Sequence, residues 1–141
     1  MDTPKVFAPG CWDLLHYGHA RFLSRAAAFG DLYVGVPTDE VVLEDKGSVP
    51  TMNLAERLEM LSYLPFVKQC VVYSKLKFLS PLGFVQPEIL AVGSEWGSAV
   101  RHRDAERWCK DNLCDVEKIG YTTSVSTSEI KQKIYRELHR G

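Results

Sequence analysis

A strand, a helix and a second strand follow one another within the first 36 residues, and this alternation constrains the fold more than any other feature. The runs "KVFAP" (5–9) and "DLYVGV" (31–36) are rich in Val and aromatic residues and are bounded by Pro, Gly and Asp, which is typical of strands. Between them, "HARFLSRAAAF" (19–29) contains strong helix formers and ends at Gly30, a typical helix C-cap. Because two strands joined by a helix lie parallel in one sheet, this segment predicts a βαβ unit.

The same alternation continues to the end of the chain. Further strands are expected at 69–73, 88–93 and 115–119, and further helices at 38–44, 53–64, 104–113 and 126–138. Two of these helices open with a capping box, formed by Asn53 with Glu56 and by Ser126 with Glu129. Strands that alternate with helices predict an α/β fold with a doubly wound parallel sheet. The irregular stretch 44–52 is expected to be a mobile loop beside the site.

Size and charge exclude several classes of protein. A chain of 141 residues predicts one domain, 1–141. The formal net charge of -1 argues against a general nucleic-acid binder. No secretory pattern precedes the first strand and no apolar run reaches membrane-spanning length, so a cytoplasmic protein without a membrane span is expected. The four cysteines form no C-x-x-C pair, which favours reduced thiols over a zinc site.

The most specific local pattern is "PGCWDLLHYGH" (9–19), which leads from the first strand into the first helix. Ligands of open α/β sheets bind beyond the carboxyl ends of the strands. Gly18 allows close approach to the backbone, and the following helix offers unpaired N–H groups and the positive end of its dipole. His16 and His19 add two hydrogen-bond donors, so this junction predicts a phosphate-binding site.

Other roles remain open for these residues. Two histidines three apart can bind a metal ion, although no third ligand has an obvious spacing, so no metal site is predicted. His16 can also simply satisfy backbone groups near the loop. Asp13 is expected to order the loop by accepting backbone hydrogen bonds rather than to bind a ligand.

Three stretches together resemble one known family. "GCWDLLHYGHARFLSRAAAFGD" (10–31) resembles the first motif of the HxGH nucleotidyltransferases, and is most similar to the cytidylyltransferase branch that acts on glycerol 3-phosphate, phosphoethanolamine or phosphocholine. "KGSVPTMNLAER" (46–57) resembles the branch's lysine-bearing loop and the helix with its E-R pair. "VSTSEI" (125–130) resembles its I-S-T motif. The resemblance spans nearly the whole chain and implies a Rossmann-like nucleotidyltransferase fold.

The resemblance implies a reaction. The phosphate of an alcohol phosphate attacks the α-phosphorus of a nucleoside triphosphate, expected to be CTP with Mg²⁺, and pyrophosphate leaves. His16 and His19 are implied to donate to phosphate oxygens, and Lys46, on a flexible loop, to reach the α-phosphate. Arg57 is implied to bind the phosphate of the acceptor or of pyrophosphate. Lys46 and Arg57 can instead be ordinary solvated charges.

The resemblance also implies a set of nucleotide-binding residues. Ser126 and Thr127, at the start of the last helix, are implied to bind the β- and γ-phosphates, although Ser126 can also act only as an N-cap. Trp96 can pack near the base or belong to the core. The full set is Pro9, Gly10, Cys11, Trp12, Gly18, Gly93, Glu95, Trp96, Thr122, Ser126 and Thr127.

Two departures from the branch affect the substrates. Tyr121 stands where the branch has an arginine that binds the triphosphate, so Arg101, Arg103 or another cation replaces it, or the nucleotide is held differently. "GSEW" (93–96) differs from the G-D-D-W of glycerol-phosphate enzymes. Heptose-phosphate adenylyltransferases share "NLAER" and lack that arginine. An adenylyltransferase for a sugar phosphate or a flavin phosphate is therefore the alternative, and a nucleotide-binding regulatory module without catalysis is a third reading.

The resemblance further implies a homodimer. The stretch "SYLPFVKQCVV" (62–72) falls where dimer contacts of the branch lie, so a two-fold dimer is expected. The other expected partners are small molecules, namely the nucleoside triphosphate and the acceptor phosphate.

Overall fold

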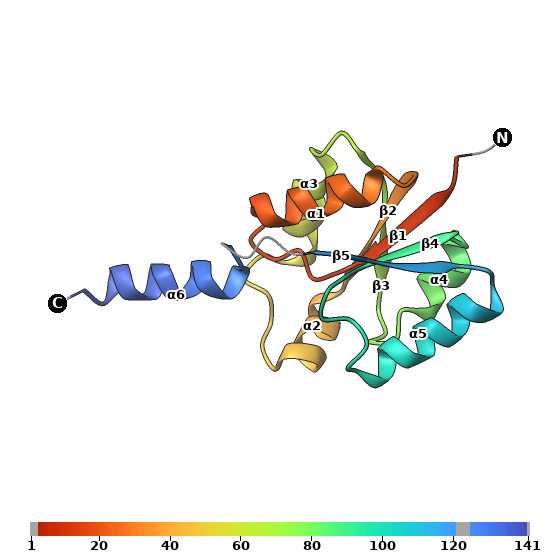
Figure 1. The fold of residues 1–141 in the computed structure, drawn as a ribbon. Coiled ribbons are helices and arrows are strands. Elements are labelled where there is room, and N and C mark those ends of the chain that lie inside the picture. Colours follow the sequence, from red (N-terminus) through yellow and green to blue (C-terminus); the bar gives the residue numbers. More distant parts are fainter. Residues whose placement is uncertain (1–2, 121–124, 141) are drawn as a thin grey trace.

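The computed structural model describes residues 3–120 and 125–140. Within them, strands and helices alternate as the sequence predicts (Figure 1). The strands are β1 (Lys5–Pro9), β2 (Asp31–Pro37), β3 (Val67–Tyr73), β4 (Ile89–Gly93) and β5 (Asp115–Ile119). The helices are α1 (Tyr17–Ala27), α2 (Asp39–Lys46), α3 (Leu54–Ser62), α4 (Leu79–Val85), α5 (Val100–Asp111) and α6 (Thr127–Leu138).

The five strands form one parallel sheet in the order β3-β2-β1-β4-β5. The chain runs outward from β1 through β2 to β3, then crosses back to β4 beside β1 and continues to β5. The direction of winding therefore reverses between β1 and β4, where doubly wound sheets bind their ligands. The predicted doubly wound parallel sheet is confirmed.

Helices cover both faces of the sheet, because side chains of a strand alternate between its two faces (Figure 1). Val6 of β1 packs in a core with Leu23 of α1 and Leu61 of α3. Its neighbour Phe7 packs on the opposite face in a second core, with Leu82 of α4 and with residues of α5. Strands buried on both faces explain the nearly continuous apolar runs of the sequence.

One helix was not predicted. α4 contains Pro81 and Gly83, and both residues have low helix propensity. Pro81 lies in the first turn, where its missing N–H costs no hydrogen bond. Leu82 and Val85 are buried in the second core, so tertiary packing stabilises this short helix against its local propensity.

The stretch expected to be a loop at 44–52 is partly helical. α2 continues through Lys46 and ends at Gly47, whose φ of 80° is the left-handed conformation that glycine adopts readily. Lys46 is therefore the last residue of a helix and does not lie on a flexible loop. This corrects the expected setting of that lysine.

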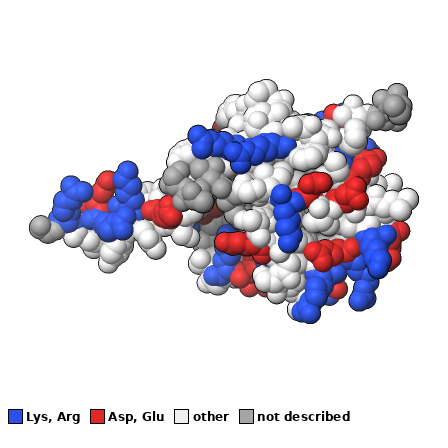
Figure 2. Space-filling view, in the orientation of Figure 1, with Lys and Arg blue, Asp and Glu red and all other residues white. Residues whose placement is uncertain are grey.

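The last helix extends away from the body of the protein (Figure 1). α6 has no buried residue, and Ile134, Tyr135 and Leu138 are exposed along it. Lys and Arg side chains gather on this helix (Figure 2). No helix in the described ranges has the length and apolar character needed to cross a membrane.

Candidate active site

The loop between β1 and α1 is held against β2 by Trp12. Trp12 has a left-handed φ of 61°, and its indole Nε1 donates to the carbonyl of Gly35 at 2.9 Å. A Cβ at Gly10 would come within 2.7 Å of the indole, so the loop needs glycine there. Trp12 is only 6% exposed and belongs to the core. The Trp12 side chain therefore positions the loop from inside, and the expected contact of Trp12 with nucleotide stays a prediction.

His16, just before α1, and His19, in its first turn, together cap the start of this helix. Nδ1 of His16 accepts hydrogen bonds from the backbone N–H groups of Gly18 at 3.1 Å and His19 at 3.4 Å. Nδ1 of His19 accepts from the backbone N–H of His16 at 3.3 Å. The two rings stack with their centroids 3.8 Å apart. This arrangement is a capping box in which imidazoles replace the usual hydroxyl and carboxylate.

The cap determines the protonation state of both rings. An Nδ1 that accepts a hydrogen bond carries no proton, so a neutral ring keeps its proton on Nε2. Burial lowers the pKa of His16 below 6.5. Burial, then the charges of His16 and Lys46, lower the pKa of His19 to about 4, with Asp13 opposing them. At neutral pH the pair therefore presents two neutral Nε2–H donors.

Gly18 brings two helix starts together. A Cβ at Gly18 would come within 2.9 Å of Cγ1 of Val125, next to the start of α6, and 3.0 Å from the ring of His16. The glycine is thus required for packing between α1 and the segment before α6. The expected role, close approach of a ligand, is untested.

Asp13 orders the loop, as predicted. Its carboxylate accepts from the backbone N–H groups of Thr51 and Met52, each at 2.8 Å. Lys131 of α6 lies 3.4 Å from Oδ2. Burial raises the pKa of Asp13, but the hydrogen bonds from Met52, Thr51 and Lys131 more than offset it, so the pKa is lowered. An ionised Asp13 ties the β1–α1 loop to the segment before α3 and to α6.

The start of α6 is held by the same loop. Thr127 Oγ1 donates to the backbone carbonyl of Asp13 at 2.9 Å, and Ser126 Oγ accepts from the N–H of Glu129 as an N-cap. The predicted phosphate contacts of Ser126 and Thr127 remain predictions. Thr122, and with it the departure at Tyr121, lies outside the described residues.

Arg57 lies in the interior, contrary to expectation. Its side chain has 0% exposure. Nε donates to the carbonyl of Met52 at 3.1 Å, and Nη1 donates to the carbonyl of Cys11 at 3.0 Å. Nη2 donates to the Pro37 carbonyl and to Asp39 Oδ1, both at 2.8 Å. With every nitrogen donating to protein atoms, the guanidinium positions the loop after β1, and its expected binding of a phosphate stays a prediction.

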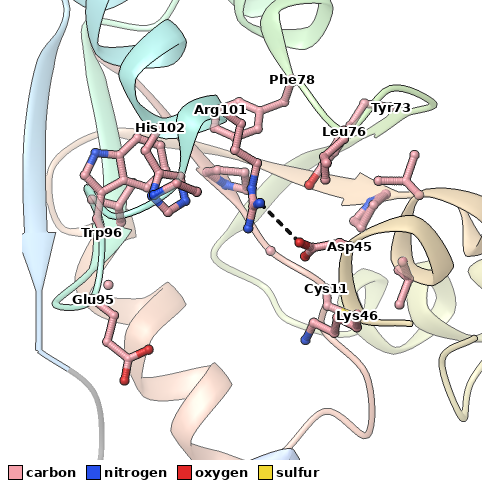
Figure 3. Close-up of a pocket in the computed structure, with 18 of the residues that line it drawn as sticks. Cys11, Asp45, Lys46, Tyr73, Leu76, Phe78, Glu95, Trp96, Arg101 and His102 are labelled. Atoms are coloured by element: carbon pink, nitrogen blue, oxygen red, sulfur yellow. Dashed lines mark hydrogen bonds and ion pairs between the residues drawn. The ribbon is translucent and has the colours of Figure 1, made fainter. Parts of the chain in front are cut away.

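A cavity of about 430 Å³ lies at the carboxyl ends of β1, β2 and β4 (Figure 3). This volume suits a small-molecule ligand. The predicted site residues that line it are Pro9, Gly10, Cys11, Lys46, Gly93, Glu95 and Trp96. The lining residues that the sequence did not suggest include Asp45, Tyr73, Phe78 and His102. Tyr73 ends β3, so its place at a strand end was the available signal.

Trp96 and His102 form a stacked pair on one wall of the cavity (Figure 3). Their ring centroids are 4.0 Å apart. His102 Nδ1 accepts from the N–H groups of Gly97 at 3.0 Å and Ala99 at 3.3 Å, and Trp96 Nε1 donates to Glu106 at 2.8 Å. Trp96 therefore lines the cavity while also packing against the second core.

A doubly wound parallel sheet whose first strand leads into a helix capped by the H-x-G-H histidines fits the Rossmann-like nucleotidyltransferases. The chain belongs to the cytidylyltransferase-like family, whose model matches residues 7–133. It is a nucleotidyltransferase.

Curated relatives cover most of this chain. The bifunctional protein HldE of Campylobacter jejuni subsp. doylei is 33% identical over 135 residues, which is 94% of this chain and 28% of the relative. HldE of Helicobacter pylori is 34% identical over 137 residues, 94% of this chain and 29% of the relative. The chain thus spans less than a third of the length of these relatives.

Solved structures support the fold. A lipopolysaccharide core biosynthesis protein of Thermoplasma volcanium has a TM-score of 0.70 at 21% identity, covering 85% of this chain and 97% of that one. Pantoate-beta-alanine ligase of Francisella tularensis has a TM-score of 0.60 at 15% identity, covering 99% of this chain and 72% of that one.

Proposed function

We propose that the chain transfers AMP from ATP to the phosphate of a sugar phosphate, releasing pyrophosphate and forming an ADP-sugar. The observation that supports nucleotidyl transfer most directly is the reciprocal cap of His16 and His19, which leaves two neutral Nε2–H donors at the switch point. The choice of ATP and a sugar phosphate is supported by the similarity to HldE proteins and by the resemblance of "NLAER" (53–57) to heptose-phosphate adenylyltransferases.

Positioning and charge stabilisation suffice for this reaction. The acceptor phosphate attacks the α-phosphorus of ATP, the bond to the β-phosphate breaks, and pyrophosphate leaves with its electron pair. Negative charge grows on the oxygens around the α-phosphorus, where fixed N–H donors lower the barrier. His16 and His19 supply such donors without changing their own charge, and Lys46 supplies a positive charge at the cavity.

The lining of the cavity suits a polar ligand with apolar faces. Tyr73, Phe78 and Trp96 give it aromatic walls, and Lys46 and Arg101 give it cationic groups. Sugar rings present C–H faces that pack on aromatic rings and hydroxyls that form hydrogen bonds, while their phosphates bind cations. A sugar phosphate therefore matches this combination.

Mg²⁺ is part of the proposal as a companion of the triphosphate. No cluster of three or more His, Cys, Asp or Glu side chains that could hold a metal ion occurs among the residues described. Mg²⁺ is commonly bound through substrate phosphates, so the nucleotide would supply most of its ligands. When bound, the ion would neutralise charge on the departing pyrophosphate.

The second candidate is CTP-dependent transfer to an alcohol phosphate, which the family model and the first sequence motif favour. A matrix of ATP and CTP against sugar 1-phosphates, flavin mononucleotide and glycerol 3-phosphate separates the candidates through pyrophosphate release with Mg²⁺. Release with ATP and a sugar phosphate alone is expected. Release with CTP and glycerol 3-phosphate would establish the second candidate, and nucleotide binding without release would support a regulatory module.

A further inference from the structure

We propose that Arg101 binds the phosphate of the acceptor, and that Asp45 occupies this arginine until the acceptor arrives. The proposal rests on the proposed nucleotidyl transfer and assigns a specific residue to its acceptor side. Arg101 is the second residue of α5, and Asp45 is the penultimate residue of α2. Both line the cavity.

The ion pair crosses the cavity. Arg101 Nη1 lies 3.1 Å from Asp45 Oδ1, and Figure 3 shows this contact between the end of α2 and the start of α5. Each side chain is 28% exposed, so the pair is in contact with solvent. Ion pairs of this exposure contribute little to stability, and one partner can be replaced at low cost.

The contacts of Arg101 contrast with those of Arg57. Arg57 donates from all three nitrogens to four acceptors and is fully buried. Within residues 3–120 and 125–140, Arg101 forms a single ion pair, the contact of its Nη1 with Asp45. A guanidinium has five N–H donors, so most of those of Arg101 remain available to an incoming anion. Arg57 therefore has a structural role, whereas Arg101 has N–H donors available to bind an anion.

The two cations of the cavity lie near different partners. The Lys46 charge acts on His19 and helps to lower its pKa, so Lys46 lies on the side of the capped histidine pair. The Arg101 charge acts on His102 and on Tyr73, both of which line the cavity. The reaction brings together two anions, the α-phosphate and the acceptor phosphate, so it needs a cation for each. Lys46 is suited to the first and Arg101 to the second.

The start of α5 also favours an anion. Its first turn has no acidic residue, and the N-terminus of a helix has the positive end of the dipole. A phosphate dianion is doubly charged and can accept two parallel hydrogen bonds from arginine, so it competes well with the single contact of Asp45. After displacement, the Asp45 carboxylate returns to water.

Two variants with opposite expected effects test the proposal. Inorganic phosphate is titrated calorimetrically into the protein saturated with a non-hydrolysable ATP analogue, which blocks the triphosphate site. Arg101→Gln should weaken phosphate binding about tenfold or more, because a charge-assisted hydrogen bond is lost. Asp45→Asn should tighten phosphate binding several-fold, because the competitor is neutralised. The KM of the acceptor should change in the same directions, with an unchanged Kd for the ATP analogue.

Arg107→Gln is the matched control, since Arg107 lies on the same helix α5, is exposed and does not line the cavity. It should leave both constants unchanged, and the melting temperature of each variant checks folding. Weaker phosphate binding in both Arg101→Gln and Asp45→Asn would show that the ion pair is structural and overturn the proposal. A weaker Kd for the ATP analogue in Arg101→Gln would assign Arg101 to the triphosphate instead.

Absence of phosphate binding by the nucleotide-saturated wild type would also overturn the proposal. The titration requires no turnover, so it gives a result for Arg101 even if the substrate matrix shows no release of pyrophosphate. Failure of the proposed function and failure of this inference are therefore separable.

Discussion

At the scale of single residues, the two histidines combine a structural and a chemical role. The same Nδ1 atoms that cap α1 fix the protons on Nε2, so the cap orients the donors. The reading of His16 as a residue that satisfies the backbone is thus correct and compatible with phosphate binding. A neutral donor is suited to stabilising charge without transferring a proton.

Asparagine substitutions separate the two roles. His16→Asn and His19→Asn keep an oxygen that can accept the backbone N–H groups but place no donor at the position of Nε2. Each should lower kcat about 10²–10³-fold, the typical cost of one preorganised donor. The melting temperature should stay close to wild type, and His139→Ala, which changes an exposed histidine just after α6, is the control. Near-wild-type turnover of either variant would remove that histidine from the mechanism.

The protonation state predicts a pH dependence. The pKa of His19 is about 4 in the folded protein and about 6.5 when unfolded, so the unfolded chain takes up a proton first as the pH falls. This contribution to stability is fully present above pH 6.5 and is lost as the pH falls toward 4. Nitrogen-15 NMR should show the Nε2–H tautomer for both rings at pH 7. A His19 that titrates near pH 6.5 would contradict the assigned burial and cap.

At the scale of elements, the positions of Lys46 in α2 and Arg57 in α3 determine whether each positive charge is accessible at the site. Lys46 is the last residue of α2, next to Gly47. Arg57 of α3 holds the β1–α1 loop by donating to the carbonyl of Cys11. The sequence suggested both cations as site residues. Only the structure shows that Lys46 is exposed at the end of a helix and that the guanidinium of Arg57 is fully buried.

Lys46→Ala should depress kcat far more than it weakens nucleotide affinity. Charge around the α-phosphorus is greatest in the transition state, so a cation lowers the barrier more than it aids ground-state binding. Lys46 is exposed, so the melting temperature should hardly change. Lys46→Arg should restore little activity, because a planar fork presents its donors differently from a compact ammonium. An unchanged kcat with a raised KM would show uniform binding instead.

Arg57 should matter first for folding. Arg57→Met leaves the Met52, Cys11 and Pro37 carbonyls without their donor and Asp39 without its partner. Removing one member of a buried ionic network costs about 3–5 kcal/mol, so denaturant unfolding should reveal a large loss of stability. Arg107→Met, on the exposed face of α5, is the control. A stable Arg57→Met variant with lost turnover would restore the phosphate role.

Whether a feature could be predicted from the sequence depends on how far apart along the chain the interacting residues lie. The βαβ unit and the helix caps at Asn53 and Ser126 depend on neighbours in sequence, so they could be predicted. The burial of Trp12 depends on a left-handed turn and on Gly35, far along the chain. The Asp45–Arg101 pair joins the end of α2 to the start of α5. These helix ends come together only when the protein folds, so no local sequence pattern predicts the pair.

At the scale of the whole molecule, the region expected to form a dimer lies at an edge of the sheet. β3 is one of the two edge strands, and Tyr63 and Val72 are 68% and 44% exposed. An exposed edge strand presents unpaired backbone groups to another chain. Two copies related by a two-fold axis can pair such strands antiparallel.

Sedimentation should therefore detect a dimer at micromolar concentrations. Val72→Lys places a charge on the edge strand and should shift the population toward monomer. Phe84→Lys, which changes an exposed residue of α4, should leave it unchanged. A wild type that sediments only as monomer would remove the dimer.

Adenylyl transfer is tested most directly by competition between the two nucleotides. One mixture contains the protein, Mg²⁺, equal concentrations of ATP and CTP, a heptose 1-phosphate and glycerol 3-phosphate, and phosphorus NMR follows the products. The expected result is an ADP-sugar and pyrophosphate in equal amounts, with CTP unchanged. Formation of CDP-glycerol with ATP unchanged would contradict the proposed function. Failure to form either an ADP-sugar or CDP-glycerol would also contradict it.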